Sequence, residues 1–159
     1  ISFITLFDYF ALLEYICNQL NSIRKNCIIY LAAAVSDFYM PKSLMPKHKI
    51  QSNLNNDGLN LNLKPVPKII GKIRKEWCPD SFLITFKLET DPDILLDKCR
   101  QALKKYNHHL VIGNILENRD KHVVMVQPDN LYQISIESGE IEEKIIDFII
   151  DLHEKFIKL

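Results

Sequence analysis

An uninterrupted apolar run over residues 27–34 constrains the fold of this chain more than any other feature. The run is β-branched at Ile28 and Ile29 and ends in three alanines. A strand with one wet face alternates apolar and polar side chains, so a continuous run indicates a strand buried on both faces, as in a parallel sheet. Such a strand needs helices packed on either side of it.

The rest of the chain supplies those helices in alternation with further strands. Thr5, with Asp8 three positions on, forms a capping box, and Asp91 followed by Pro92 is a favoured helix start. Apolar spacing predicts helices over residues 6–24, 67–77, 91–106 and 140–156, and strands over residues 59–63, 82–86, 110–115, 122–126 and 131–136. A turn signal precedes the last strand, which is expected to pair antiparallel with its neighbour. This order predicts an α/β class with a three-layer Rossmann-like fold, a mainly parallel sheet and an antiparallel C-terminal hairpin.

Residues 35–56 interrupt this pattern with prolines, asparagines and other polar residues. A loop of this length inside a compact domain is usually functional or disordered. It is too short to divide two domains, so we expect a single domain over residues 1–159 with a flap at about residues 36–56.

Composition excludes several classes of function. Acidic and basic residues balance at 20 each, which gives no support for binding nucleic acid or an anionic membrane. Uncharged runs reach only about ten residues, whereas a membrane-spanning helix needs about 20. The four cysteines are widely spaced and form no C-x-x-C pair, so we interpret them as reduced residues of the core or of element boundaries and expect a cytoplasmic protein.

Several familiar sites are also missing from the sequence. Only four glycines occur, and they form neither a dinucleotide-binding fingerprint nor a P-loop. His108, His109 and His122 lack ligand spacing with cysteine or carboxylate residues, so no metal site is expected. The chain begins with Ile1 rather than methionine, which together with the few glycines suggests a piece of a longer protein.

Candidate chemistry lies at the ends of the predicted strands, where open α/β sheets bind ligands. Asp37 follows the three alanines and either faces a ligand crevice or caps a loop. The charged residues of 86–91 either face the same crevice or cap the next helix, and Asn114 either bonds a nucleobase or holds a neighbouring loop. In the flap, Lys47 and Lys49 either close over anionic groups or form an ordinary solvated cluster.

Five segments together resemble the eukaryotic phosphopantothenoylcysteine synthetases in order and spacing. They are LAAAVSDFY at residues 31–39, MPKHKIQS at 45–52, VPK at 66–68, FKLETD at 86–91 and GNILENR at 113–119. The match extends over nearly the whole chain, which is then expected to be the C-terminal part of such a protein. The resemblance implies ligation of 4′-phosphopantothenate to L-cysteine with ATP and Mg²⁺, through an acyl-adenylate, by a homodimer.

The resemblance also implies roles for particular residues. Lys49 matches a flap lysine that stabilises charge on the nucleotide and acyl phosphate, and is the residue expected to be catalytic. Ala33 and Ala34 match a small pair whose backbone faces the pantothenate moiety, and Asp37 matches a nucleotide-contacting aspartate. Further nucleotide-binding positions implied by the match are Val66, Pro67, Lys68, Phe86, Ala102 and Tyr106. Bacterial relatives that prefer CTP carry lysines at the last two positions, so Ala102 and Tyr106 favour the use of ATP.

The chain departs from the family in lacking the glycine-rich phosphate-binding segment that precedes these motifs. We therefore expect this piece alone to be inactive. Two other classes stay open: a non-catalytic relative that keeps the fold and binds partners, and a nucleotide-binding oxidoreductase, against which the missing glycine fingerprint counts. An intact Lys49 with its flap motif favours the ligase over the non-catalytic relative.

Overall fold

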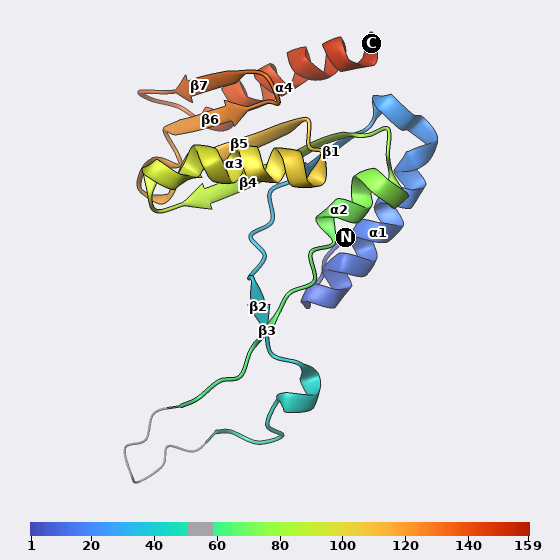
Figure 1. Cartoon of the computed structure of the whole chain (residues 1–159), viewed down its shortest axis with the longest axis vertical. Coiled ribbons are helices and arrows are strands. Elements are labelled where there is room, and N and C mark those ends of the chain that lie inside the picture. Colours follow the sequence, from blue (N-terminus) through green and yellow to red (C-terminus); the bar gives the residue numbers. More distant parts are fainter. Residues whose placement is uncertain (51–58) are drawn as a thin grey trace. The chain divides into compact units, whose positions relative to one another are not determined.

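The computed structural model describes residues 1–50 and 59–159, which divide into two compact units (Figure 1). The first unit consists of Ile1–Ala33 and Ile69–Leu159, and the second unit is Ala34–Lys68. The flap expected at residues 36–56 belongs to the second unit, but its residues 51–56 lie outside the described part of the chain. A single domain over residues 1–159 stays a prediction.

One sheet of five strands organises the first unit, in the order β1-β4-β5-β6-β7. The strands are β1 (Ile28–Leu31), β4 (Phe82–Glu89), β5 (Leu110–Ile115), β6 (His122–Val126) and β7 (Leu131–Ser135). β1, β4 and β5 pair in parallel, whereas β6 is antiparallel to both β5 and β7. Four strands therefore point the same way, and the predicted α/β fold with a C-terminal antiparallel hairpin is confirmed.

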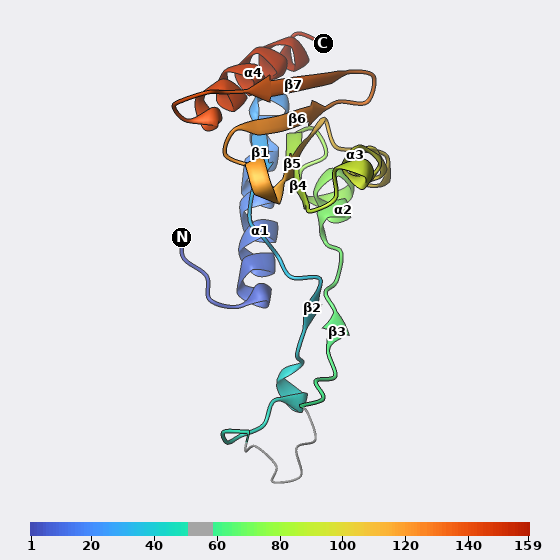
Figure 2. The same ribbon diagram turned by 90° about the vertical axis from the view of Figure 1, so that its left-hand side faces the viewer.

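Helices cover both faces of this sheet and complete the three layers (Figure 2). On one face, α4 (Ile141–Ile157) packs Ile141, Ile145 and Ile149 against the inward residues of β4, β5 and β6. The opposite face is covered by α1 (Leu6–Leu20), by α2 (Ile70–Lys72) with a following π-helical turn (Ile73–Trp77), and by α3 (Pro92–Tyr106). Because helices cover both faces of this sheet, its strands consist of continuous apolar runs.

The alternation of side chains along each strand decides which layer a residue joins. In β1, Ile28 packs in the cluster beneath α4, while Ile29 packs in the cluster beneath α1. In β4, Ile84 faces α4 and Leu83 faces α1. Even-numbered residues of β1, β4 and β5 therefore face α4, which defines the side of the sheet discussed below.

Local capping explains where the helices begin. The Thr5 backbone N–H donates to the Asp8 carboxylate at 2.9 Å, and the Asp8 N–H donates to the Thr5 hydroxyl at 3.2 Å. Asp91 accepts from the Asp93 N–H at 2.9 Å, with Pro92 at the first helical position. Both predicted helix starts are confirmed because each depends on contacts within one turn of chain.

The predicted end of the first helix is wrong. α1 stops at Leu20, and a 3₁₀ segment (Asn21–Asn26) replaces its expected last turn. Within that segment Arg24 has a positive φ of 50°, which ends helical geometry before the chain enters β1.

Three further elements differ from expectation in extent or position. The strand predicted over residues 27–34 is shorter, at Ile28–Leu31, the residues that pair in register with Phe82–Thr85 of β4. Residues 59–63 are not a strand despite their alternating leucines, and the helix expected from residue 67 begins only at Ile70.

The second unit has little regular structure. β2 (Phe38–Tyr39) pairs antiparallel with β3 (Lys64–Pro65), and a single 3₁₀ turn (Lys42–Leu44) follows β2. Among the core residues of the described chain, only Val66 belongs to this unit.

In the part of the chain that the structure describes, no helix combines the length and apolar character needed to cross a bilayer.

Candidate functional site

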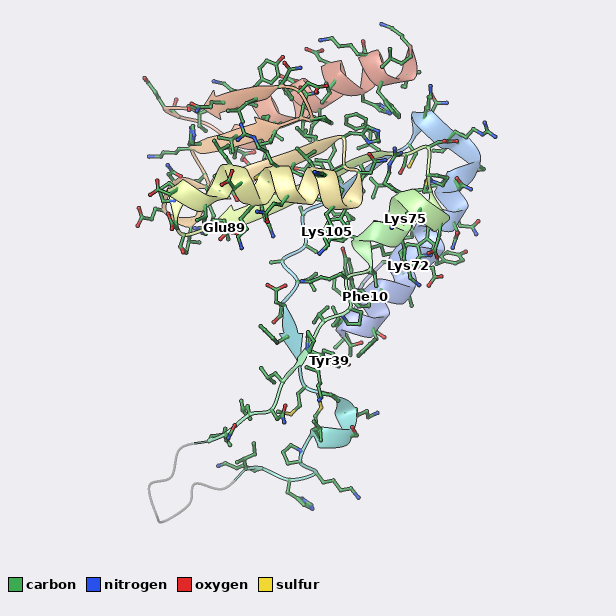
Figure 3. All side chains as sticks on the ribbon, viewed as in Figure 1. Phe10, Tyr39, Lys72, Lys75, Glu89 and Lys105 are labelled. Atoms are coloured by element: carbon green, nitrogen blue, oxygen red, sulfur yellow. The ribbon has the colours of Figure 1, made fainter. Side chains whose placement is uncertain are left out.

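The candidate site in the first unit is the edge where the parallel strands β1, β4 and β5 end. Their carboxyl ends lie at the same edge because the strands pair in parallel and in register. Ala33 is exposed just beyond β1, and Glu89 closes β4 (Figure 3). This is the edge at which open α/β sheets bind ligands.

Phe86 is the predicted site residue that lies on the α4 side of this edge. It is partly buried and packs against the apolar cluster beneath α4. The ring of Tyr30 from β1 meets it edge to face, with the ring centroids 5.1 Å apart and an interplanar angle of 81°. Sequence reasoning missed Tyr30, since the only signal was its place inside an apolar run.

Asn114 of β5 carries an unusual polar atom on the same side of the sheet. Its side-chain oxygen is buried and, within the described part of the chain, has no hydrogen-bond partner. Leaving a buried acceptor unpaired costs about 1–3 kcal/mol. Asn114 aligns with Leu88, two residues beyond Phe86 on β4.

Gly113 allows β5 to lie close against α3 at this point. A Cβ atom added to Gly113 would come within 2.8 Å of both the Cys99 sulfur and the Val124 side chain. Because those neighbours belong to the packed cluster beneath α3, the absent side chain is a packing requirement that positions Asn114 beside it.

In the second unit, the structure brings together three predicted nucleotide-binding residues that are far apart in sequence. The Lys68 ammonium forms an ion pair and hydrogen bond with the Asp37 carboxylate. The Val66 N–H donates to the Asp37 carbonyl at 2.9 Å, and Val66 is buried. The ion pair of Asp37 and Lys68 joins the chain on either side of the two strands. Because both side chains are largely exposed, the pair adds little stability.

The remaining predicted residues of the second unit are exposed. Ala34 and Pro67 adjoin the two ends of the unit, and Lys49 lies in the irregular stretch after the 3₁₀ turn. Gln51 and Ser52, which belong to the flap motif, fall outside the described residues. An exposed lysine on an irregular segment keeps a fully solvated ammonium, the form that can neutralise phosphate charge.

Ala102 and Tyr106 are not brought together with Phe86. Ala102 packs in the cluster beneath α3, on the face opposite α4. Tyr106 ends α3 and stacks on His108, with ring centroids 5.5 Å apart. In Figure 3, Glu89 at the end of β4 lies beside the start of α3, whereas Lys105 lies at the far end of α3, so Tyr106 lies away from the carboxyl edge of β4. The resemblance in sequence gave no information about which face of the sheet these two residues join. Their contact with a nucleotide stays a prediction, which the place of Ala102 on the face opposite α4 does not favour.

Of the three histidines that sequence reasoning excluded as metal ligands, His108 is buried and His109 and His122 are partly buried. His108 is bonded through Nδ1 to the Thr85 hydroxyl at 2.9 Å, and burial lowers its pKa to about 4. His109 accepts the Leu83 N–H at 3.0 Å through Nδ1, and burial likewise lowers its pKa to about 4. Both rings are therefore neutral at physiological pH. Among the described residues, no three histidine, cysteine or carboxylate side chains are grouped to hold a metal ion.

All four cysteines are free thiols buried in the first unit. Burial raises the pKa of Cys17 to about 12 and that of Cys27 to about 11, so neither forms a thiolate readily. A thiol in this state is a packing residue rather than a nucleophile.

Together the fold and the edge define the class of protein: a three-layer α/β unit whose carboxyl strand edge carries an aromatic ring and an amide oxygen with no hydrogen-bond partner among the described residues. The chain belongs to the DNA/pantothenate metabolism flavoprotein C-terminal domain family, whose model matches residues 13–147.

Named relatives confirm the resemblance seen in the motifs. The chain is 45% identical to the human phosphopantothenate–cysteine ligase, covering 99% of this chain and 52% of the relative. It is 41% identical to the ligase CAB2 of Saccharomyces cerevisiae, covering 98% of this chain and 48% of the relative. The chain thus spans about half the length of the curated relatives it matches.

Solved structures agree with these relationships. A Cab2 mutant in complex with phosphopantothenate-cysteine superposes with a TM-score of 0.91 at 41% identity, covering 99% of this chain and 53% of that chain. A DNA/pantothenate metabolism flavoprotein from Streptococcus pneumoniae gives a TM-score of 0.71 at 20% identity, covering 97% of this chain and 71% of that chain, which shows the shared fold.

Proposed function

We propose that this chain is part of a phosphopantothenate–cysteine ligase of coenzyme A biosynthesis. The proposal is carried by one observation: the motif residues Asp37, Val66 and Lys68, 29 to 31 positions apart in sequence, are folded onto one another. The relatives named above, each a phosphopantothenate–cysteine ligase, support the same reaction.

The reaction requires activation because a carboxylate is a poor electrophile. A carboxylate oxygen of 4′-phosphopantothenate attacks the α-phosphorus of ATP, the bond to the β-phosphate oxygen breaks, and pyrophosphate leaves. The amine of L-cysteine then attacks the acyl carbon, loses a proton, and displaces AMP to give the amide. Negative charge accumulates on phosphate oxygens in both steps, so a positioned cation lowers both barriers.

Lys49 is the residue proposed to supply that cation. Its ammonium is solvated and carried by an irregular segment, which allows it to approach bound phosphates. Asp37, Lys68 and the intervening Val66 and Pro67 are proposed to contact the nucleotide, and Phe86 to lie against its base. The backbone of Ala33 and Ala34, free of bulky side chains, is proposed to face the pantothenate moiety.

ATP and Mg²⁺ are proposed as co-substrate and metal. Mg²⁺ is usually held by substrate phosphates with one or two carboxylates rather than by a protein cage. The described residues, which offer no cage of three ligands, fit that mode, and the ion is proposed to enter with the nucleotide. Its charge supplies part of the neutralisation that the polyphosphate needs.

We also propose that the full-length protein is a cytoplasmic homodimer. The four free thiols are compatible with a reducing compartment. The dimer is supported by the family resemblance, and sedimentation of the full-length protein at micromolar concentration tests it.

The first experiment measures pyrophosphate release by the full-length protein with ATP, Mg²⁺ and phosphopantothenate. Release that requires phosphopantothenate, and that Lys49→Ala reduces by about 100-fold or more, supports acyl-adenylate chemistry. CTP is tested in parallel to decide the nucleotide. A folded wild-type protein that releases no pyrophosphate with either nucleotide contradicts the ligase and favours a non-catalytic relative.

A further inference from the structure

Tyr30 contacts Phe86, the residue proposed above to lie against the base of the nucleotide. Tyr30 aligns with Ile84 in the parallel pairing of β1 and β4, so Phe86 is its diagonal neighbour toward the carboxyl edge. Both side chains are even-numbered positions on the α4 side of the sheet. At a centroid distance of 5.1 Å and an angle of 81°, the two rings meet in the favoured edge-to-face geometry.

This contact restricts the orientation of the Phe86 ring. The Phe86 ring packs against the cluster beneath α4 and meets the Tyr30 ring edge to face, and both contacts oppose its rotation. A partly buried phenylalanine without such a neighbour loses rotamer freedom when a ligand binds, and that loss weakens binding. An orientation held before binding removes the penalty.

The hydroxyl of Tyr30 is not required for this contact. Burial and the nearby Glu142 carboxylate raise the pKa of Tyr30, so the phenol stays neutral. A neutral ring presents an unaltered edge to Phe86, and a phenylalanine in its place would present the same edge.

We propose that Tyr30 is a positioning residue for nucleotide binding, holding the Phe86 ring in the plane that stacks on the base. This inference rests on the proposed function, because it takes Phe86 as the ring against the base. Stacking of a base on an aromatic side chain contributes to nucleotide binding, and part of that contribution depends on the ring being held in place.

The test measures binding of a fluorescent ATP analogue by the full-length protein, together with steady-state kinetics. Tyr30→Leu removes the ring and is expected to weaken nucleotide binding about three- to tenfold, raising the nucleotide KM and leaving the KM for phosphopantothenate and the saturated kcat within about twofold. Tyr30→Phe, the matched control, is expected to bind like the wild type. In a Phe86→Leu background, Tyr30→Leu is expected to cause no additional loss.

Wild-type affinity in Tyr30→Leu overturns the inference, and so does an undiminished loss in the Phe86→Leu background, because Tyr30 would then act independently of Phe86. Tyr30→Met, which keeps apolar bulk, replaces Tyr30→Leu if the latter does not fold. A wild-type protein that binds the analogue but releases no pyrophosphate contradicts the ligase and leaves the positioning role standing. A wild-type protein that binds neither the ATP nor the corresponding CTP analogue overturns both.

Discussion

The two units of this chain are stabilised in different ways. The first unit buries three apolar clusters on the two faces of its sheet, whereas the second contributes Val66 alone to the core residues of the described chain. A two-stranded ribbon of two residues per strand is not stable by itself. Substitutions in the first unit should therefore change stability, and substitutions in the second should change function at nearly constant stability.

The largest expected effect is on the stability of the first unit. Ile84 is fully buried beneath α4, and Ile84→Ala leaves a cavity that should cost about 2–5 kcal/mol of unfolding free energy in urea. The matched change in the second unit is Leu61→Ala, at a leucine that is 48% exposed, and should cost less than about 0.5 kcal/mol. Equal losses of unfolding free energy in the two variants would contradict the difference between the two units.

The second effect is catalytic and belongs to the second unit. Lys49→Ala should reduce pyrophosphate release by about 100- to 1,000-fold, as expected for a group that neutralises charge in the transition state. The melting temperature should not change, because the side chain is exposed. Lys47→Ala, on the same segment, is the control and should retain most activity. A similar loss in both variants would indicate a general electrostatic effect of the flap.

The third effect is a pH dependence confined to the first unit. The pKa of His108 is about 4 in the folded protein against an ordinary value of 6.5, so the unfolded chain binds more protons between these values. Stability is therefore fully present above about pH 6.5 and falls as the pH drops toward 4, by about 1–3 kcal/mol for this buried ring.

Urea denaturation between pH 7 and pH 4 measures this dependence. His108→Gln keeps a polar partner for Thr85 and should flatten the profile relative to the wild type. The exposed His48 of the second unit gives the control, His48→Gln, which should follow the wild-type profile. Identical slopes for wild type and His108→Gln would show that other groups dominate the acid response.

The smallest effect concerns the ion pair of the second unit. Asp37 and Lys68 have side chains that are 73% and 58% exposed, and solvent screens their attraction. A double-mutant cycle with Asp37→Asn and Lys68→Met should give a coupling free energy below about 1 kcal/mol. The same variants should weaken nucleotide binding more than they change stability. A coupling well above that value would mean that the pair, and not the ribbon, orders the unit.

Elements with local causes were predictable. The Asp91–Pro92 start of α3 and the capping box at Thr5 depend on contacts within a few residues, and both predictions are confirmed. The strands over residues 110–115 and 122–126 were predicted with their observed bounds because they are buried on both faces. The five motifs also predicted the family, since their order along the chain is a property of the sequence.

Elements that depend on a partner were not predictable. The alternating leucines of residues 59–63 predicted a strand, but the ribbon forms at Lys64–Pro65, where β2 offers hydrogen-bonding partners. Nor did the sequence indicate that α3 turns Ala102 toward the cluster on the face opposite Phe86, and the nucleotide contact of Ala102 and Tyr106 stays a prediction.

The sequence by itself determined the order of helices and strands, the capped starts of α1 and α3, and the membership of the family, because periodicity and capping act over short distances along the chain. Tertiary structure alone decided that Tyr30 meets Phe86, that the Asn114 oxygen is left unpaired, and that Asp37 pairs with Lys68. Each of these contacts joins residues at least 28 positions apart or depends on which neighbours enclose an atom. Strand register and burial set them, and neither is encoded in any local run of residues.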